Sequence, residues 1–165
     1  MIDKSAGGVY ENPMRKIKKL SWISGGALAV IMLAAGLHPA LAQVRDGNPG
    51  RSGQTLEIKP LLGQTRTTVF DFYSPYCPPC MQLAPLMEKL AAKRPEVTFV
   101  KVNINRPEVK GIDWKSPLAQ QYGIKSVPCF MIFDSQGKLK AEGNEARKTV
   151  TDWLQKAGLL PPSNN

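Results

Sequence analysis

The chain has 165 residues and a formal net charge of +9 at pH 7, which is enough material for one domain with a core of its own. Part of that charge belongs to the first 42 residues, and the remainder contains no long basic run with interleaved aromatic residues. The composition therefore favours a soluble domain with a basic surface and argues against nucleic-acid binding.

The first 42 residues follow the order of a secretory signal peptide. A basic start, Met14–Lys19, precedes the largely apolar stretch Leu20–Leu37, and Ala40-Leu41-Ala42 has the form of an Ala-x-Ala cleavage site. Such a signal does not need the polar residues 1–13, so Met14 is an alternative initiator. We expect a signal peptide over residues 1–42, with the signal proper at 14–42, cleavage after Ala42 and a periplasmic or otherwise exported product.

The apolar stretch also permits an uncleaved membrane anchor. Leu20–Leu37 has 18 residues and approaches the length that spans a bilayer. Serine and glycine dilute its first half, which favours cleavage. An anchored chain would associate with the membrane but would still carry its domain outside the cytoplasm.

The segment after the signal is expected to lack regular structure. Residues 43–54 are rich in Gly, Pro, Asn and Arg without periodicity, which predicts a flexible leader. The folded domain is expected over residues 55–160, followed by a C-terminal tail at 161–165. Its first elements are predicted to be a short strand at Leu56–Ile58 and a connection through Pro60–Arg66.

The next stretch, residues 67–93, contains two of the three cysteines. Thr67–Tyr73 is β-branched and aromatic and predicts a strand, whereas Met81–Lys93 has apolar residues at helical spacing and predicts a helix. Pro85 should kink that helix, because it removes a backbone hydrogen bond. Between strand and helix lies Cys77-Pro78-Pro79-Cys80, with Cys77 expected near the helix N-cap.

Two cysteines three residues apart at a helix start favour disulfide exchange. Their spacing of roughly 5–6 Å on one helix face is one that a disulfide tolerates, and the helix dipole favours a thiolate at the N-cap. We predict Cys77, from its position and expected exposure, as the nucleophile and the more buried Cys80 as the resolving thiol.

Zinc is the main alternative for a Cys-x-x-Cys pair. A structural zinc site uses four Cys or His ligands, but the chain has three cysteines and one histidine, His38, which lies in the segment expected to be removed. We therefore expect no metal and no cofactor. The lack of histidine also argues against Cys–His nucleophilic catalysis.

The remaining segments complete an α/β pattern. A strand is predicted at Val97–Asn103, and a short helix at Ser116–Tyr122 with Ser116 as cap and Pro117 in the first position. Between them, Ile104–Lys115 is expected to be a surface loop held by a packed Trp114, with a partner-binding loop as the alternative.

The last third of the chain alternates strand, turn, strand and helix. These elements are predicted at Cys129–Phe133, Asp134–Gly137, Leu139–Glu142 and Glu145–Ala157. A βαβ half followed by a ββα half indicates an α/β domain. Its central mixed β-sheet would be flanked by helices on both faces.

Residues from about Thr55 to Leu159 resemble the thioredoxin family. Asp71–Cys80 is similar to the family's active-site strand and turn, with Asp71 at the place of its buried aspartate. Pro85 matches the helix-kinking proline, and Lys101 matches the lysine that neighbours the aspartate. Ser126-Val127-Pro128 resembles the cis-proline loop, in which the peptide bond before the proline is cis and the backbone faces the disulfide.

The resemblance implies a thioredoxin fold and a thiol–disulfide oxidoreductase of the exported bacterial branch. Its partners would be proteins with thiols or disulfides, together with a membrane or periplasmic electron donor. Gly143 fits the glycine beside the substrate groove. The residues expected to contact substrate are Tyr76, Pro78, Pro79, Val127, Pro128 and Gly143.

Three departures from the family pattern bear on specificity. The dipeptide between the cysteines is Pro-Pro instead of Gly-Pro, Ile104–Lys115 is longer than the usual connection, and Cys129 follows the cis-proline candidate. Tyr73 and Tyr76 also stand where tryptophans are usual. These tyrosines and Trp114 either shape a substrate surface or are packing residues.

Asp71 has two possible environments. A buried carboxylate of raised pKa could accept the Cys80 proton when the mixed disulfide resolves, whereas an aspartate at a sheet edge in water could not. The alternation of its strand and the resemblance favour the first.

The predicted direction of electron flow is reduction of the client. Pro78 and Pro79 have no N–H to stabilise a Cys77 thiolate, and the nearby Asp71 carboxylate would disfavour it. Three alternatives remain open: an oxidant on the same fold, a copper or other metal handler that uses Cys129 as a third thiol, and a redox-inert binding module.

Overall fold

The structure is a computed structural model that describes residues 44–162. The predicted signal peptide, the predicted cleavage site after Ala42 and the end of the predicted tail lie outside the described residues. Within residues 44–162 no helix has the length and apolar character needed to cross a membrane.

The core of the fold is a mixed five-stranded sheet with the order β1-β3-β2-β4-β5. β3 pairs in parallel with β1 and β2, whereas the pairs β2–β4 and β4–β5 are antiparallel. The strands are β1 (Arg45–Asp46), β2 (Thr67–Tyr73), β3 (Val97–Asn103), β4 (Cys129–Phe133) and β5 (Leu139–Glu142). The predicted α/β class is confirmed.

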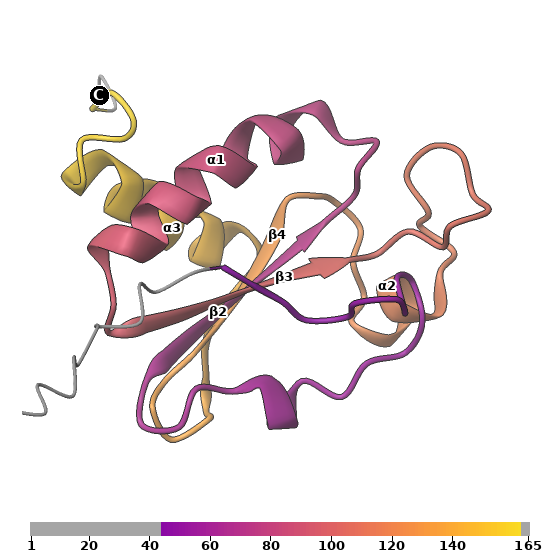
Figure 1. The fold of residues 1–165 in the computed structure, drawn as a ribbon, viewed down its shortest axis with the longest axis horizontal. Coiled ribbons are helices and arrows are strands. Elements are labelled where there is room, and N and C mark those ends of the chain that lie inside the picture. Colours follow the sequence, from indigo (N-terminus) through magenta and orange to yellow (C-terminus); the bar gives the residue numbers. More distant parts are fainter. Residues whose placement is uncertain (1–43, 163–165) are drawn as a thin grey trace, which may run out of the picture. The chain divides into compact units, whose positions relative to one another are not determined.

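Helices cover both faces of the sheet (Figure 1). They are η1 (Lys59–Leu61, a 3₁₀ turn), α1 (Pro78–Lys93), α2 (Pro117–Gln121) and α3 (Gly143–Lys156). α1 and α3 bury Val69 and Phe99 on one face, and α2 with the segment that carries η1 buries Phe70 and Phe72 on the other. Because side chains alternate along a strand, Asp71 belongs to the face of Val69, beneath α1.

The order of the predicted strands and helices is confirmed from β2 onward. α3 begins two residues before the predicted start and ends one residue before the predicted end. Ser116 caps α2 by accepting the Ala119 N–H at 3.1 Å. The predicted turn joins β4 to β5, where the Asp134 N–H bonds to the Lys138 carbonyl.

The predicted strand at Leu56–Ile58 is wrong. Both backbone groups of Leu56 bond to the side-chain amide of Gln121, at 2.9 and 3.1 Å, so they pair with α2 and not with a neighbouring strand. Leu56 and Ile58 pack against the apolar face, and the chain then turns into η1. Side-chain groups of α2 therefore take the place of the strand partners that the prediction required.

Part of the predicted flexible leader belongs to the sheet. Arg45 and Asp46 form the edge strand β1 beside Val100 and Lys101. Asn48 is buried, and its side-chain amide exchanges hydrogen bonds with the backbone of Asn103 at 2.8 and 3.0 Å. Polar side chains that replace backbone partners give no apolar periodicity, which is why the pattern predicted a leader.

The loop between β3 and α2 is not held by a packed Trp114. Trp114 is exposed, whereas Asp113 is buried and binds the Arg106 guanidinium through both oxygens at 2.7 and 3.1 Å. Asn105 adds a side-chain hydrogen bond to the Gly111 carbonyl. A polar network inside the loop therefore fixes it and leaves the indole outside.

Candidate functional site

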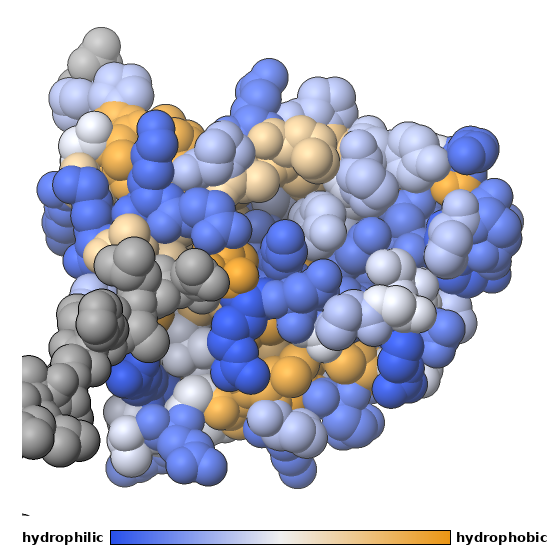
Figure 2. All heavy atoms as spheres, viewed as in Figure 1, coloured by the Kyte–Doolittle hydropathy of each residue, from blue (hydrophilic) through white to orange (hydrophobic). Residues whose placement is uncertain are grey.

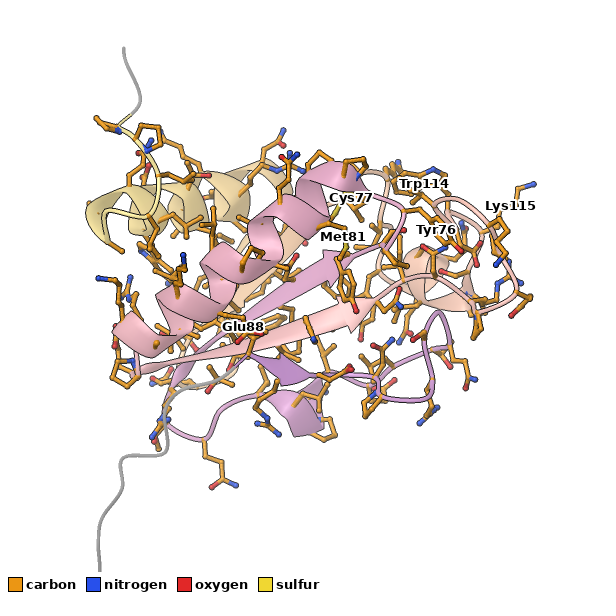
Figure 3. The ribbon with its side chains drawn as sticks, turned by 45° about the horizontal axis from the view of Figure 1, so that its top comes forward. Tyr76, Cys77, Met81, Glu88, Trp114 and Lys115 are labelled. Atoms are coloured by element: carbon orange, nitrogen blue, oxygen red, sulfur yellow. A yellow bond between two sulfur atoms is a disulfide. The ribbon has the colours of Figure 1, made fainter. Side chains whose placement is uncertain are left out.

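Three chain segments meet at one edge of the sheet. Parallel strands β2 and β3 end together at Tyr73 and Asn103, and Cys129 at the start of antiparallel β4 pairs with Phe72. The turn into α1, the loop after β3 and the segment before β4 therefore share this edge. Figure 3 shows Tyr76, Cys77 and Trp114 there.

Cys77 and Cys80 form a disulfide with Cα atoms 5.3 Å apart. Cys77 is the N-cap of α1, as predicted, and its Sγ accepts the Cys80 N–H at 3.2 Å. Pro78 and Pro79 occupy the first two helical positions and offer no N–H. Among the described residues, Cys80 is therefore the one amide bonded to this sulfur.

Ser74 shapes the turn that delivers Cys77. This buried serine accepts the Tyr76 N–H through its hydroxyl at 3.1 Å, and its carbonyl accepts the Cys77 N–H at 3.1 Å. Sequence reasoning passed over Ser74. Its signal was the tendency of serine to bond nearby backbone groups in a turn.

The predicted exposure of Cys77 is wrong for the disulfide form. Cys77 is 2% exposed and Cys80 is 3% exposed, so exposure does not distinguish the two sulfurs. Position does, because Cys77 Sγ lies at the helix N-cap, 3.6 Å from the Val127 carbonyl oxygen, whereas Cys80 lies one turn into α1 and lines the cavity that Asp71 also lines. A loop about 50 residues away covers Cys77, which a local pattern could not indicate.

The segment before β4 has the predicted form. The Val127–Pro128 peptide bond is cis, and Pro128 is buried. Arg147 of α3 donates a hydrogen bond to the Pro128 carbonyl. Arg147 was not among the predicted site residues, because nothing in its local sequence separates it from a surface arginine.

Cys129 lies between this segment and α3. Burial raises the pKa of the Cys129 thiol, although the Arg147 charge and the Gly143 backbone act in the opposite direction. Gly143 itself has a φ of +57°, the left-handed region that glycine adopts without strain. The structure thus places the predicted Gly143 beside Cys129.

Asp71 is buried behind the disulfide. It lines a cavity of ≈ 130 Å³ together with Tyr73, Cys80, Glu88 and Lys101. Burial raises the pKa of Asp71 to about 7. Its Oδ1 has no hydrogen-bond partner among the described residues. The cavity is large enough for water, so a proton can pass between Cys80 and Asp71 through it.

Lys101 stands beside Asp71 in the register of β2 and β3. Its side chain lines the same cavity, but residues 44–162 contain no ion pair between the two. Glu88, which sequence reasoning did not single out, lies at the cavity and accepts the Val44 N–H at 3.3 Å. The described residues hold no group of three or more His, Cys, Asp or Glu placed to bind a metal.

The comparisons with known proteins agree with this geometry. The sequence model of the family Thioredoxin matches residues 57–156. A thioredoxin-like protein of Fusarium culmorum is 40% identical over 93 residues, which cover 54% of this chain and 69% of that protein. Human glutaredoxin-3 is 30% identical over 137 residues, 81% of this chain but 38% of its own length.

A solved structure shares the fold. Thioredoxin f from spinach chloroplast, in its short form, has a TM-score of 0.50 and 24% identity, and the match covers 72% of this chain and 96% of that one. The family acts on thiols and disulfides of protein substrates. From the matched model and the Cys77–Cys80 disulfide, this chain belongs to the thioredoxin family of protein-disulfide oxidoreductases.

Proposed function

We propose that the chain is exported, is cleaved after Ala42, and reduces disulfides of other exported proteins. The basic, apolar and Ala-x-Ala order of residues 14–42 supports export. The proposal that the chain reduces its clients depends on one observation: among the described residues, only the Cys80 amide bonds to Cys77 Sγ. A weakly stabilised thiolate makes the dithiol ready to give up electrons.

The reaction takes two exchange steps. The Cys77 thiolate attacks one sulfur of a client disulfide, a mixed disulfide forms, and the second client sulfur leaves as a thiolate that takes a proton from water. Cys80 then loses its proton to Asp71 and attacks Cys77 Sγ. The first client sulfur leaves as a thiolate that takes a proton from water, the Cys77–Cys80 disulfide forms, and two electrons have passed to the client.

The buried carboxyl suits the second step. At neutral pH an Asp71 pKa of about 7 leaves a substantial fraction of the group ionised and able to accept a proton. A dithiol reductase of the membrane or periplasm would then restore the Cys77 and Cys80 thiols by the reverse exchange.

The equilibrium of the Cys77–Cys80 pair with a glutathione buffer tests the direction. We expect a potential nearer to about −270 mV, typical of reducing members, than to about −120 mV, typical of strong oxidants. A Cys77 pKa below about 5 together with a strongly oxidising disulfide would overturn the reductant assignment and favour the oxidant.

Two matched variants isolate the role of the prolines. An N-cap side chain accepts from the second or third helical N–H, so Pro79→Ala should return one donor to the Cys77 sulfur, lower its pKa and make the disulfide more oxidising. Pro78→Ala restores an N–H at the first position and should change the pKa less. Equal changes of the Cys77 pKa in the two variants would contradict the proposal that the number of N–H donors to its sulfur sets this pKa.

N-terminal sequencing of the protein from the cell envelope tests export. The expected first residue is Gln43. A membrane-bound product that retains Leu20–Leu37 would contradict cleavage and support the anchored alternative, with the domain still outside the cytoplasm. A full-length product in the cytoplasm would contradict export.

A further inference from the structure

Three large apolar side chains are exposed around α1 and the active-site edge. Met81 is 48% exposed, Tyr76 is 41% and Trp114 is 38%, and the fourth such residue of the described chain, Leu139 at 43%, lies on β5. Figure 2 shows that the visible face is largely hydrophilic, with hydrophobic side chains gathered in a few areas.

Hydrogen bonds fix the backbone at Trp114 and on both sides of it. On one side, Asp113 is buried and paired with Arg106, and on the other, Ser116 is buried as the cap of α2. Gln120 donates its side-chain amide to the Trp114 carbonyl at 2.7 Å. An aromatic side chain on a fixed backbone loses little entropy on binding, which is why tryptophan is frequent among residues that dominate interfaces.

An open hollow of ≈ 320 Å³ adjoins the indole. Trp114, Gln120, Ile124 and Lys125 line it. Lys125 is exposed and has no carboxylate partner within residues 44–162, and Lys115 is in the same situation. The hollow therefore combines an exposed indole with unpaired positive charge.

The hollow is close to the segment that covers the reacting disulfide. Two residues after Lys125, the Val127 carbonyl oxygen lies 3.6 Å from Cys77 Sγ. An extended chain advances about 3.3 Å per residue, so a polypeptide whose cysteine reacts at Cys77 has a side chain two or three residues away within reach of the hollow. Figure 1 and Figure 3 both place the loop between β3 and α2, which carries Trp114, at the end of the sheet where β2 leads into α1.

We propose that the Trp114 hollow docks an extended client segment with an apolar side chain and a nearby carboxylate, two or three residues from the reacting cysteine. The apolar side chain packs against Trp114 and Ile124, and the carboxylate pairs with Lys125. Among proteins that carry a disulfide, those with such a segment would therefore be the preferred clients. The inference rests on the proposed function for its kinetic readout but not for its binding readout.

Reduction kinetics of two disulfide-bridged peptides test the selection. The first peptide carries Leu and Glu after its cysteine, the second carries Ala and Lys there, and 2-hydroxyethyl disulfide reports the chemistry without docking. For Trp114→Ala, the kcat/KM for the first peptide, divided by that for the small disulfide, should fall about tenfold. Leu139→Ala is the matched control and should leave this ratio unchanged.

Reversing the charge of Lys125 tests its pairing with the client carboxylate. Lys125→Glu should weaken reduction of the first peptide and improve that of the second. A Trp114→Ala variant whose ratio is unchanged, or one that slows the peptide and the small disulfide equally, would overturn the docking role. A dimer that Trp114→Ala dissociates and Leu139→Ala does not would assign the hollow to a second copy and overturn the client.

A binding measurement separates this inference from the proposed function. The first peptide with serine in place of cysteine should bind the oxidised protein in calorimetry, and Trp114→Ala should weaken it. If the protein reduces no disulfide but still binds this peptide through Trp114, the reductase proposal fails and the docking proposal stands. Absence of binding, or binding that Trp114→Ala leaves unchanged, overturns the docking proposal.

Discussion

Asp71 and Lys101 are neighbours across β2 and β3, yet no ion pair joins them within the described part of the chain. The carboxyl instead lies buried with one oxygen unpartnered, in the cavity that it shares with Cys80. An unpaired buried carboxyl costs stability when it ionises, so its retention behind the disulfide is consistent with a role as proton acceptor.

Asp71→Asn should slow the second exchange step and stabilise the fold at high pH. The native pKa of about 7 lies above the usual value near 3.8. The folded state therefore holds the extra proton between these values, and stability falls as pH rises from about 4 to about 7. The difference approaches about 4 kcal/mol. Denaturant unfolding of both proteins at pH 4.5 and pH 8, about the ends of this window, measures it.

The pH dependence of the second exchange step tests Asp71 as the proton acceptor. Resolution of a preformed mixed disulfide should lose its dependence on a group of pKa about 7 in the Asn variant. Glu96→Asn, at an exposed carboxylate in the turn between α1 and β3, is the control. An unchanged pH profile in Asp71→Asn would exclude Asp71 as the base.

Cys80→Ser should trap mixed disulfides with clients, whereas Cys77→Ser should trap none. Cys77 is the N-cap of α1 beside Val127, and Cys80 lies one turn into the helix beside Asp71, so we expect the client to exchange with the first. Non-reducing gels of each variant show the adducts. Equal trapping by the two variants would reverse or abolish the assignment of roles.

Cys129→Ser should leave reduction of a small disulfide within about twofold of the original rate, because the exchange needs two thiols. Burial raises the pKa of Cys129 and keeps it a thiol at neutral pH, so iodoacetamide should modify it slowly in the folded protein. Timed alkylation followed by mass spectrometry measures this. A large loss of activity would point to a three-thiol mechanism or a metal site.

Arg147→Ala should destabilise the protein by about 1.5–3 kcal/mol, the range for hydrogen bonds to charged groups. The variant leaves the buried Pro128 carbonyl without the guanidinium that bonds to it. Lys148→Ala, at the exposed next position, is the matched control. Denaturant midpoints compare them, and similar small shifts in both would show that this contact contributes little.

The sequence by itself determined the elements whose signals are local. The β-branched run of Thr67–Tyr73, the helical spacing after Cys80 and the Ser116-Pro117 cap each depend on neighbouring residues, and each is present in the structure. The position of Cys77 at the helix N-cap and the loss of donors at Pro78 and Pro79 followed from the same local rules.

Only the tertiary structure decided which polar residues were fixed and which apolar ones stayed outside. Asn48 joins the sheet through the backbone of Asn103, and Asp113 is buried because Arg106 pairs with it. The Val127 carbonyl covers Cys77 from a segment 50 residues away. These contacts form between residues distant in the chain, or between polar groups without periodicity, so composition and spacing carry no trace of them.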